Sequence, residues 1–446
     1  MKKLYVLAFI ALSLIIALPV FAAPRVALPH RLTWDADMID SDISGKTGAG
    51  VYIAVLDTGL TSNWRDYFPP ERIATELGKG FYEPVHYDPQ TGQDVEAGYI
   101  VETSFIGSTY STHGTHVVST IIGYNYYSPT DAAQGYPLPP IYVEGIAPGA
   151  TIIPVKVLHN YNLGQEGKFV FGTSDAVAAG INYVTSLKLA HPEWPIVISM
   201  SIGSSEPAEV EKTAIDNAIA AGVIVVAAAG NDGLAGMDWP GAYPEVISAG
   251  SVGWKYEWYA PTTSPPPRYR LWWLQDSTYG YRDIPETTPS GDVYVSDFSG
   301  RENQTRAEPF PWAGSQQLDV LAPGSWVRGP FPGTPGYAHL PWWSEGKPRG
   351  VPYGGSYYYV GGTSMATPHV SAVAAMLLEK QPTLTQSQVE NTLKSTAMPI
   401  PAGEMLIYDI APAPPQPPGW YNMTWGGTEA TGAGLLQAKA AVDAVP

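Results

Sequence analysis

The sequence predicts an α/β fold in three layers, with a mainly parallel β-sheet between two layers of helices. The first observation is a set of short runs rich in Val, Ile and Ala, in which apolar residues follow one another without alternating. Such runs are typical of strands buried on both faces of a parallel sheet. The runs are VYIAVLD (51–57), TIIPVKVL (151–158), PIVISMSIG (195–203), VIVVAAAGN (223–231), VISAGSV (246–252) and LDVLAPG (318–324).

Helical patterns between these runs are the second observation. They are HGTHVVSTIIG (113–123), SDAVAAGINYVTSLKLAH (174–191) and EVEKTAIDNAIAAG (209–222). The last pattern closes on Gly222, a residue type that often caps a helix C-terminus. Thr385 and Gln388 have the spacing of a capping box, which predicts the start of a late helix. In folds of this class, ligands bind at the carboxyl ends of the strands.

Composition narrows the class of protein and its partners. Of the 446 residues, 45% are hydrophobic and 15% are charged, which is enough for a substantial core. The formal net charge of −17 argues against nucleic acid or an anionic lipid surface as the main partner. The chain has no cysteine, but it has 43 prolines, 14 tryptophans and 28 tyrosines. Stiff loops and aromatic packing are therefore expected to stabilise it in place of disulfides.

The N-terminus has the pattern of a secretory signal peptide. Lys2 and Lys3 precede an apolar run over residues 4–21, and Ala22 and Ala23 follow it. A charged start, an apolar centre and a small-residue exit predict cleavage after one of these two alanines.

We therefore expect residues 1–22 to be removed and residues 23–446 to form one domain, secreted or held at the cell surface. The alternative is an uncleaved membrane anchor, because the apolar run approaches the ~20 residues that span a bilayer. Pro19 and the small-residue exit favour removal, so no stable membrane insertion is expected. Four segments rich in Pro, Gly, Tyr and Trp interrupt the pattern and are expected to be ordered surface loops: about 78–111, 254–297, 326–359 and 399–427.

Three residues at the ends of predicted elements could act together in nucleophilic catalysis. Asp57 ends the first strand, His113 begins a helix, and Ser364 follows two glycines at the start of a long apolar helix. A serine hydroxyl needs a base and an oxyanion site, and the free amides of a first helical turn can supply the second. The order Asp, His, Ser is one of three known for this chemistry, and GTSMA is not the GxSxG of lipases and esterases. Taken singly, each residue could instead cap or support an element.

Two further residues have both a functional and a structural interpretation. Asn231 ends a strand, where its amide can donate a hydrogen bond into a cleft, although a turn or cap is the default. His116 follows His113 by three residues, so both rings share a helix face and could bind a metal. HExxH is absent and acidic residues are few nearby, so a metal hydrolase is the weaker reading. We interpret His116 as a hydrogen-bonded structural neighbour.

The stretches VLDTGL, HGTHV, MSIGS, AAAGN and GTSMATPH together resemble those of the subtilisin-like serine proteases, or subtilases. The resemblance extends from about Trp34 to residues 432–444. It implies a subtilisin-like fold and a secreted serine endopeptidase with broad protein or peptide substrates, acting through an acyl-enzyme. A rival hypothesis is a catalytically silent subtilase fold whose aromatic segments bind a cell-surface polymer or partner.

The resemblance also implies a role for each catalytic position. Asp57 would orient the imidazole, and His113 would act as the general base and then as the acid. Ser364 would be the nucleophile, and Asn231 with the Ser364 amide would form the oxyanion hole.

Five residues are implied in substrate binding. Ser201, Ile202 and Gly203 match the segment that pairs with extended substrate, a form of strand addition. Gly230 would lie on the other side of the cleft. Asp238 falls at the base of the primary specificity pocket, where a carboxylate would favour Lys or Arg before the scissile bond. An ordinary surface aspartate is the alternative.

The resemblance implies no cofactor for the chemistry itself. Structural calcium is common among relatives, and Asp66, Asp131 and Glu144 offer the oxygen ligands that calcium prefers. Asp66 falls where one such ligand could lie, but the loop after the His113 helix (residues 124–143) does not match the usual ligand pattern, so no metal ligand is assigned.

Overall fold

The computed structural model describes most of the chain. The described residues are 33–107, 112–126, 141–163, 167–255, 292–332, 357–409 and 419–446, with short strands at 258–259, 269–270 and 342–343. The predicted signal peptide (residues 1–22) and Asp131 lie outside the described residues. Within the described part, no helix is both long and apolar enough to cross a lipid bilayer.

A central sheet organises the fold. Its strands are β1 (Tyr52–Asp57), β2 (Lys79–Tyr82), β5 (Val101–Thr103), β8 (Thr151–Lys156), β11 (Ile196–Met200), β12 (Ile224–Ala228), β13 (Ile247–Trp254), β16 (Val293–Val295) and β17 (Val320–Pro323). Within the described residues these nine strands have the order β16-β13-β12-β11-β1-β8-β2-β5, and β17 pairs with β13. The pairs β13–β16 and β2–β5 are antiparallel, and the others are parallel. All six apolar runs form strands here, which confirms the predicted mainly parallel α/β fold.

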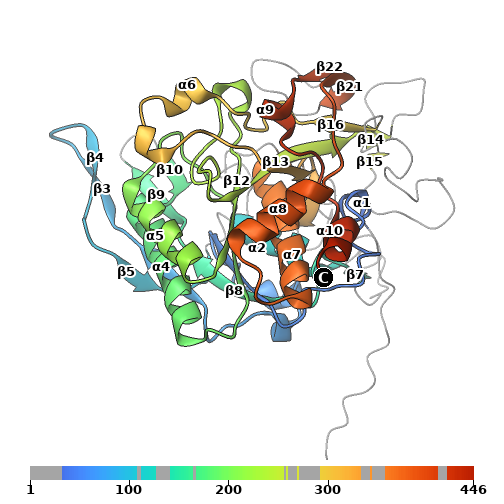
Figure 1. The fold of residues 1–446 in the computed structure, drawn as a ribbon. Coiled ribbons are helices and arrows are strands. Elements are labelled where there is room, and N and C mark those ends of the chain that lie inside the picture. The colour runs from blue at the N-terminus through green and yellow to red at the C-terminus, as the bar shows by residue number, and fades with distance from the viewer. Residues whose placement is uncertain are drawn as a thin grey trace, which may run out of the picture.

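Helices cover both faces of the sheet. The helices of the described residues are α1 (Trp34–Met38), α2 (His113–Ile122), α4 (Ser174–Ala190), α5 (Glu209–Ala220), α6 (Gln304–Ala307), α7 (Thr363–Lys380), α8 (Gln386–Thr396), α9 (Thr428–Thr431) and α10 (Ala438–Ala444). Of these, α2, α4, α5, α7 and α8 contact strands of the sheet. α4 packs on β1, β2 and β11, whereas α7 packs on β1, β11, β12, β13 and β17. Figure 1 shows α4 and α5, in green, apart from α2, α7 and α10. The predicted caps are present: Thr385 and Gln388 form a capping box, and Gly222 has φ +87°.

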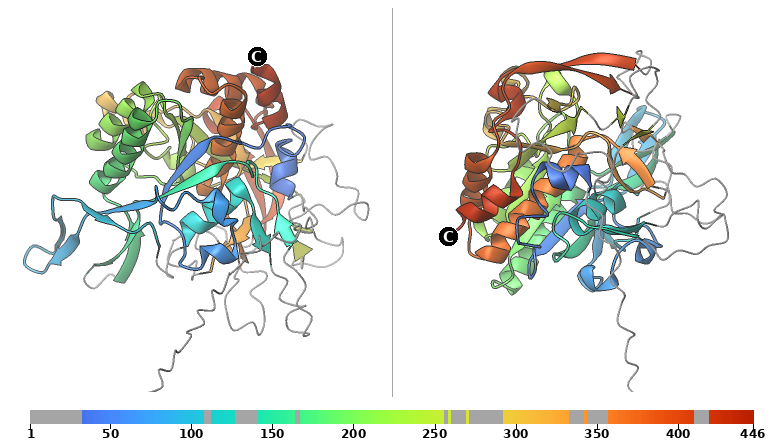
Figure 2. Two further views of the ribbon diagram at one scale, coloured as in Figure 1. Left: turned by 90° about the horizontal axis from the view of Figure 1, so that it is seen from below. Right: turned by 90° about the vertical axis from the view of Figure 1, so that its right-hand side faces the viewer.

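The aromatic segments differ from the loops that we expected, because their described parts are largely antiparallel ribbons. Tyr, Trp and Val suit a pleated, half-buried surface, and here they outweigh the Pro and Gly around them. The hairpin of β3 and β4 projects from the body of the protein (Figures 1 and 2). The ribbon strands are β3 (Val85–Asp88), β4 (Gln93–Glu96), β14 (Trp258–Tyr259), β15 (Tyr269–Arg270), β18 (Val327–Pro330), β19 (Trp342–Trp343), β20 (Tyr357–Val360), β21 (Gly403–Asp409) and β22 (Gly419–Trp425).

Two more hairpins complete the strands: β6 (Tyr124–Tyr126) with β7 (Ile141–Val143), and β9 (His159–Leu163) with β10 (Gly167–Phe171).

The two ends of the described chain meet on the central helix α7. The imidazole Nε2 of His369, in α7, lies 3.1 Å from Oδ2 of Asp35 in α1. The Ala438 N–H at the start of α10 donates to the Ile39 carbonyl just after α1, and α10 packs against α7. Figure 1 shows α1 beside α10. The helix that begins with the GTSMA motif is therefore held by residues from both ends.

Candidate active site

The carboxyl end of β1 and the first turn of α2 bring Asp57 and His113 together. His113 Nδ1 lies 2.8 Å from both carboxylate oxygens of Asp57. Asp57 is fully buried and also accepts a hydrogen bond from the Thr58 N–H at 2.6 Å. An ionised carboxylate can only accept, so Nδ1 carries the proton of this contact and Nε2 of the neutral ring is left as a base.

A glycine permits this close approach of strand and helix. A Cβ on Gly114 would lie 2.6 Å from the Gly59 carbonyl oxygen and 3.1 Å from Asp57 Oδ1. The Gly114 N–H donates to Thr58 Oγ1 at 2.9 Å, which ties the first turn of α2 to the end of β1. The Asp57–His113 geometry therefore depends on the residue that follows the histidine.

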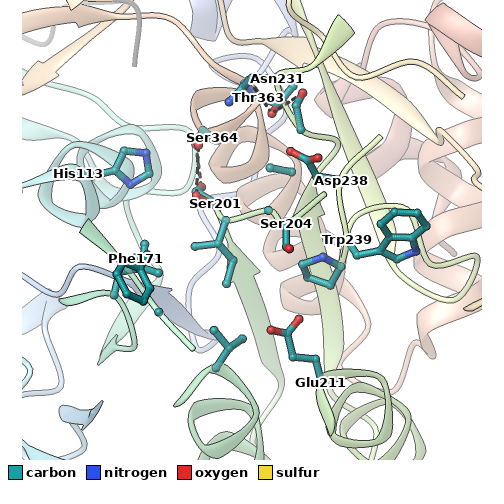
Figure 3. A pocket seen from close by; sticks show the side chains of 18 of the residues that line it. His113, Phe171, Ser201, Ser204, Glu211, Asn231, Asp238, Trp239, Thr363 and Ser364 are labelled. Carbon is teal, nitrogen blue, oxygen red and sulfur yellow. Dashed lines mark hydrogen bonds between the residues drawn. The ribbon is translucent and has the colours of Figure 1, made fainter. Parts of the chain in front are cut away.

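Ser364 lies in the first turn of α7, on the wall of the same cleft as His113. Its hydroxyl donates to the Ser201 carbonyl at 3.2 Å, and Ser201 Oγ donates back to the Ser364 carbonyl at 2.7 Å. Figure 3 shows the His113 ring and the Ser364 hydroxyl at one end of the cleft. To reach the imidazole, the hydroxyl has to rotate away from Ser201.

The Asn231 side chain is held in one orientation by its neighbour. Its Oδ1 accepts hydrogen bonds from the Thr363 N–H at 2.9 Å and from Thr363 Oγ1 at 3.0 Å. Because Oδ1 is the acceptor for a backbone N–H, Nδ2 is turned outwards as a donor. The backbone N–H of Ser364, in the first turn of α7, is a second donor beside it. Two such donors can bind a developing oxyanion.

The cleft has a volume of about 300 Å³ and lies at the carboxyl ends of the parallel strands. His113, Asn231 and Ser364 line it, and so do all the predicted substrate-binding residues: Ser201, Ile202, Gly203, Gly230 and Asp238. The structure thus brings together the residues predicted for catalysis and substrate binding, and Asp57 stands behind His113.

Asp238 lies against the two glycines of the cleft wall. A Cβ on Gly203 would come within 2.8 Å of the Asp238 Cβ, and one on Gly230 within 2.5 Å of its Oδ2. Arg306 Nη2 lies 2.9 Å from Asp238 Oδ1, and Arg306 Nη1 lies 3.0 Å from Asp232 Oδ2. Burial, and then the Asp232 charge, raise the pKa of Asp238 to about 6 despite Arg306. The Asp238 carboxylate already has a cationic partner within the protein.

Glu211 is a cleft residue that the sequence reasoning missed. It is the third residue of α5, is 7% exposed and lines the same cavity. Burial raises its pKa to about 7, and a hydrogen bond with Ser174 partly opposes this rise. A signal was present, because Glu211 shares the helical spacing of the buried residues Ile215 and Ala218. This spacing predicts that the Glu211 carboxylate lies on the apolar face of α5.

His116 has the structural role that we expected. Its Nε2 lies 3.1 Å from the Val327 carbonyl oxygen, to which it donates. Burial lowers the pKa of His116 to about 3, so the ring stays neutral. Among the described residues, neither His116 nor His113 belongs to a group of three potential metal ligands.

One group of carboxylates could hold a hard cation. One oxygen each from Glu83, Glu96 and Asp175 lies within 4.8 Å of the others. Glu83 is fully buried; its Oε1 accepts from the Gly98 N–H, while Oε2 has no hydrogen-bond partner among the described residues. Burial and the two neighbouring carboxylates raise the pKa of Glu96. An all-oxygen donor set of this kind suits calcium.

The group differs from the calcium ligands considered in the sequence. Asp66 instead accepts a hydrogen bond from Asn63 on the surface, and Glu144 is not part of the group.

Comparisons with known proteins agree with this architecture. A model of the subtilase family matches residues 48–440. Subtilisin E of Bacillus subtilis (strain 168) is 27% identical over 358 residues, which are 79% of this chain but only 62% of that protein. Subtilisin of Bacillus pumilus is also 27% identical, over 79% of this chain and 86% of its own length.

Solved structures share the fold. The S41 psychrophilic protease covers 92% of this chain and 99% of its own, with a TM-score of 0.53 and 22% identity. Fervidolysin from Fervidobacterium pennivorans, described as a keratinolytic enzyme related to subtilisin, covers 93% of this chain and 46% of its own. Its TM-score is 0.52 at 23% identity.

Proposed function

Because the chain belongs to the subtilase family, we propose that it is an active serine endopeptidase that cleaves proteins and peptides. The observation that carries this proposal is the buried Asp57–His113 pair, with both carboxylate oxygens 2.8 Å from Nδ1. His113 lines the same cleft as Ser364, which lies at a helix N-terminus. We propose the catalytic roles for Asp57, His113 and Ser364 that the motifs imply.

Acylation begins when the Ser364 hydroxyl turns from the Ser201 carbonyl towards His113 Nε2. His113 takes the hydroxyl proton as Oγ bonds to the scissile carbonyl carbon. Nδ2 of Asn231 and the Ser364 N–H bind the resulting oxyanion. His113 then gives the proton to the leaving amine, and the carbon–nitrogen bond breaks.

Deacylation repeats these steps with water. His113 removes a proton from water as it attacks the acyl-enzyme, and then returns that proton to Ser364 Oγ as the acid product leaves. Throughout, Asp57 holds the imidazole in the tautomer that keeps Nε2 free and stabilises the imidazolium.

The cleft supports an extended substrate. Ser201, Ile202 and Gly203 follow β11, and Gly203 is exposed on the cleft wall. We propose that the substrate backbone pairs with this segment as an added strand, with Gly230 opposite. We propose that Asp238 lies at the base of the primary specificity pocket, where its ion pair with Arg306 weakens the preference for Lys or Arg before the scissile bond.

We further propose that the enzyme is secreted or held at the cell surface after removal of residues 1–22. The support is the charged start, apolar run and small-residue exit at the N-terminus.

Digestion of casein by the purified protein and by a Ser364→Ala variant tests the proposal. Ser186→Ala, an exposed serine on α4, is the matched control. A serine-directed phosphonate should label the parent and the control but not Ser364→Ala. Absence of both digestion and labelling in the parent would favour the silent, binding form of the fold.

A further inference from the structure

Glu211 is a carboxylate at the end of the cleft away from the reacting serine. Figure 3 shows Ser364 and His113 at one end and Glu211 at the other, with its carboxylate reaching from α5 into the cleft. Both ends belong to one cavity. Glu211 therefore faces substrate space, but not the scissile bond.

The Glu211 carboxylate has no cation to balance it among the described residues. Its neighbours within the protein are the uncharged side chains of Ser174, which lowers the pKa of Glu211, and Tyr243, whose pKa Glu211 raises. Lys212, the next residue of α5, is directed elsewhere: its Nζ lies 2.6 Å from Asp216 Oδ1 and 3.4 Å from Glu245 Oε2. This contrasts with Asp238, whose charge is paired with Arg306 at 2.9 Å. The cleft thus has two carboxylates, and the more distant one lacks a counter-charge.

The cavity that Glu211 lines suits a long basic side chain. Val177, Ile202 and Pro240 line the same cavity and offer apolar surface for a methylene stem. A buried carboxylate without a cation is unfavourable, and an ammonium or guanidinium group from a ligand relieves that penalty with a charge-assisted hydrogen bond. An uncharged side chain of the same length gains the apolar contact but leaves the carboxylate unbalanced.

We propose that Glu211 selects Lys or Arg at a substrate position at least two residues from the scissile bond. This inference rests on the proposed endopeptidase function. Figure 3 places Glu211 at the far end of the cleft from Ser364, and successive residues of an extended peptide advance about 3.3 Å each and point to alternate faces. The side chain beside the scissile bond is held near Ser364, so a different residue of the same peptide reaches Glu211.

The test is a series of internally quenched peptides with one fixed cleavage site, in which Lys, Arg, norleucine and Glu are placed in turn at each other position. At one position, not adjacent to the cleaved bond, kcat/KM should favour Lys over norleucine by about 10-fold or more. Glu211→Gln should reduce this ratio to near one, and Glu211→Asp should retain part of it. Glu209→Gln, an exposed glutamate on the first turn of α5, should keep the parent ratio.

The outcomes separate this inference from the proposed function. Cleavage with the same Lys-to-norleucine ratio in the parent and in Glu211→Gln overturns the inference and leaves the endopeptidase intact. A preference confined to the residue next to the scissile bond, and lost in Asp238→Asn, also overturns it, because Asp238 would then be the determinant. Absence of any cleavage by a parent that shows cooperative unfolding overturns the proposed function, and this inference with it.

Discussion

Replacing Glu211 by glutamine should stabilise the free protein, most strongly in alkaline solution. Burial raises the pKa of Glu211 from 4.5 to about 7. Each pH unit corresponds to about 1.4 kcal/mol, so the ionised carboxylate costs the folded state about 3 kcal/mol relative to the unfolded chain. Glutamine keeps the shape and the hydrogen-bonding capacity toward Ser174 but carries no charge.

The sign of the pH dependence follows from the two pKa values of Glu211. The unfolded chain releases the Glu211 proton near pH 4.5, whereas the folded protein holds it to about pH 7. The free energy of unfolding therefore falls as pH rises between these values, and the loss is complete above about pH 7. Glu211→Gln removes this loss, so its advantage should be absent near pH 4 and full near pH 8.

Thermal unfolding in a Ser364→Ala background measures the effect without self-digestion. Unfolding entropy is about 2 cal/mol/K per residue, so about 3 kcal/mol raises the Tm of a chain of roughly 400 residues by about 4 °C. Glu209→Gln is the control for losing a negative charge from the first turn of α5. An equal shift at both pH values, or none near pH 8, would refute the account of Glu211 as a buried, unbalanced carboxylate.

Three further predictions concern catalysis and metal binding. Asp57→Asn should lower kcat on a chromogenic peptide by about 10⁴, because the amide favours the wrong imidazole tautomer; a loss below 10-fold would contradict the orienting role. Asn231→Ala should lower kcat by about 10²–10³, the known effect of removing this donor in subtilisin, with little change in KM. The substitution also removes the acceptor of the Thr363 hydrogen bonds, so the Tm of the variant is measured to detect any loss of stability. Millimolar calcium should raise the Tm of the parent by a few degrees, as expected for a ligand well above its Kd. Glu83→Gln should abolish that gain. An equal gain in the parent and in Glu83→Gln would show that calcium binds at another site.

Much of the fold could be predicted because it follows from local patterns. Strands such as β11 and β12 are buried on both faces, so their apolar runs are unbroken and easy to recognise. The proposed catalytic residues lie at element ends. The carboxyl ends of strands in a parallel sheet share one edge, so Asp57 and Asn231 could be placed together. The ribbon of β21 and β22 was harder to predict, because the Pro and Gly residues of this segment favour loops whereas its Tyr and Trp residues favour strands.

The remaining features depend on contacts between distant parts of the chain. Arg306 neutralises Asp238 across 68 residues, and nothing near either residue predicts their pairing. The partnership of Asp35 with His369 spans 334 residues. Local patterns show which side chains are turned inwards, but they do not show which of them meet. Glu211 illustrates this limit: its helical spacing predicts burial, but its position in the substrate cleft depends on where α5 packs.

The contacts that α1 and α10 make with α7 determine when, during synthesis, the proposed nucleophile is held in place. Asp57 is made early, Ser364 is made more than three hundred residues later, and the serine's helix packs on α1 and on α10. Loop closure over such distances comes late in folding. A chain still emerging from the ribosome therefore contains Asp57 and His113 but not yet an aligned Ser364. If Ser364 is the nucleophile, as proposed, we expect no peptide-bond cleavage until α10 has docked on α7.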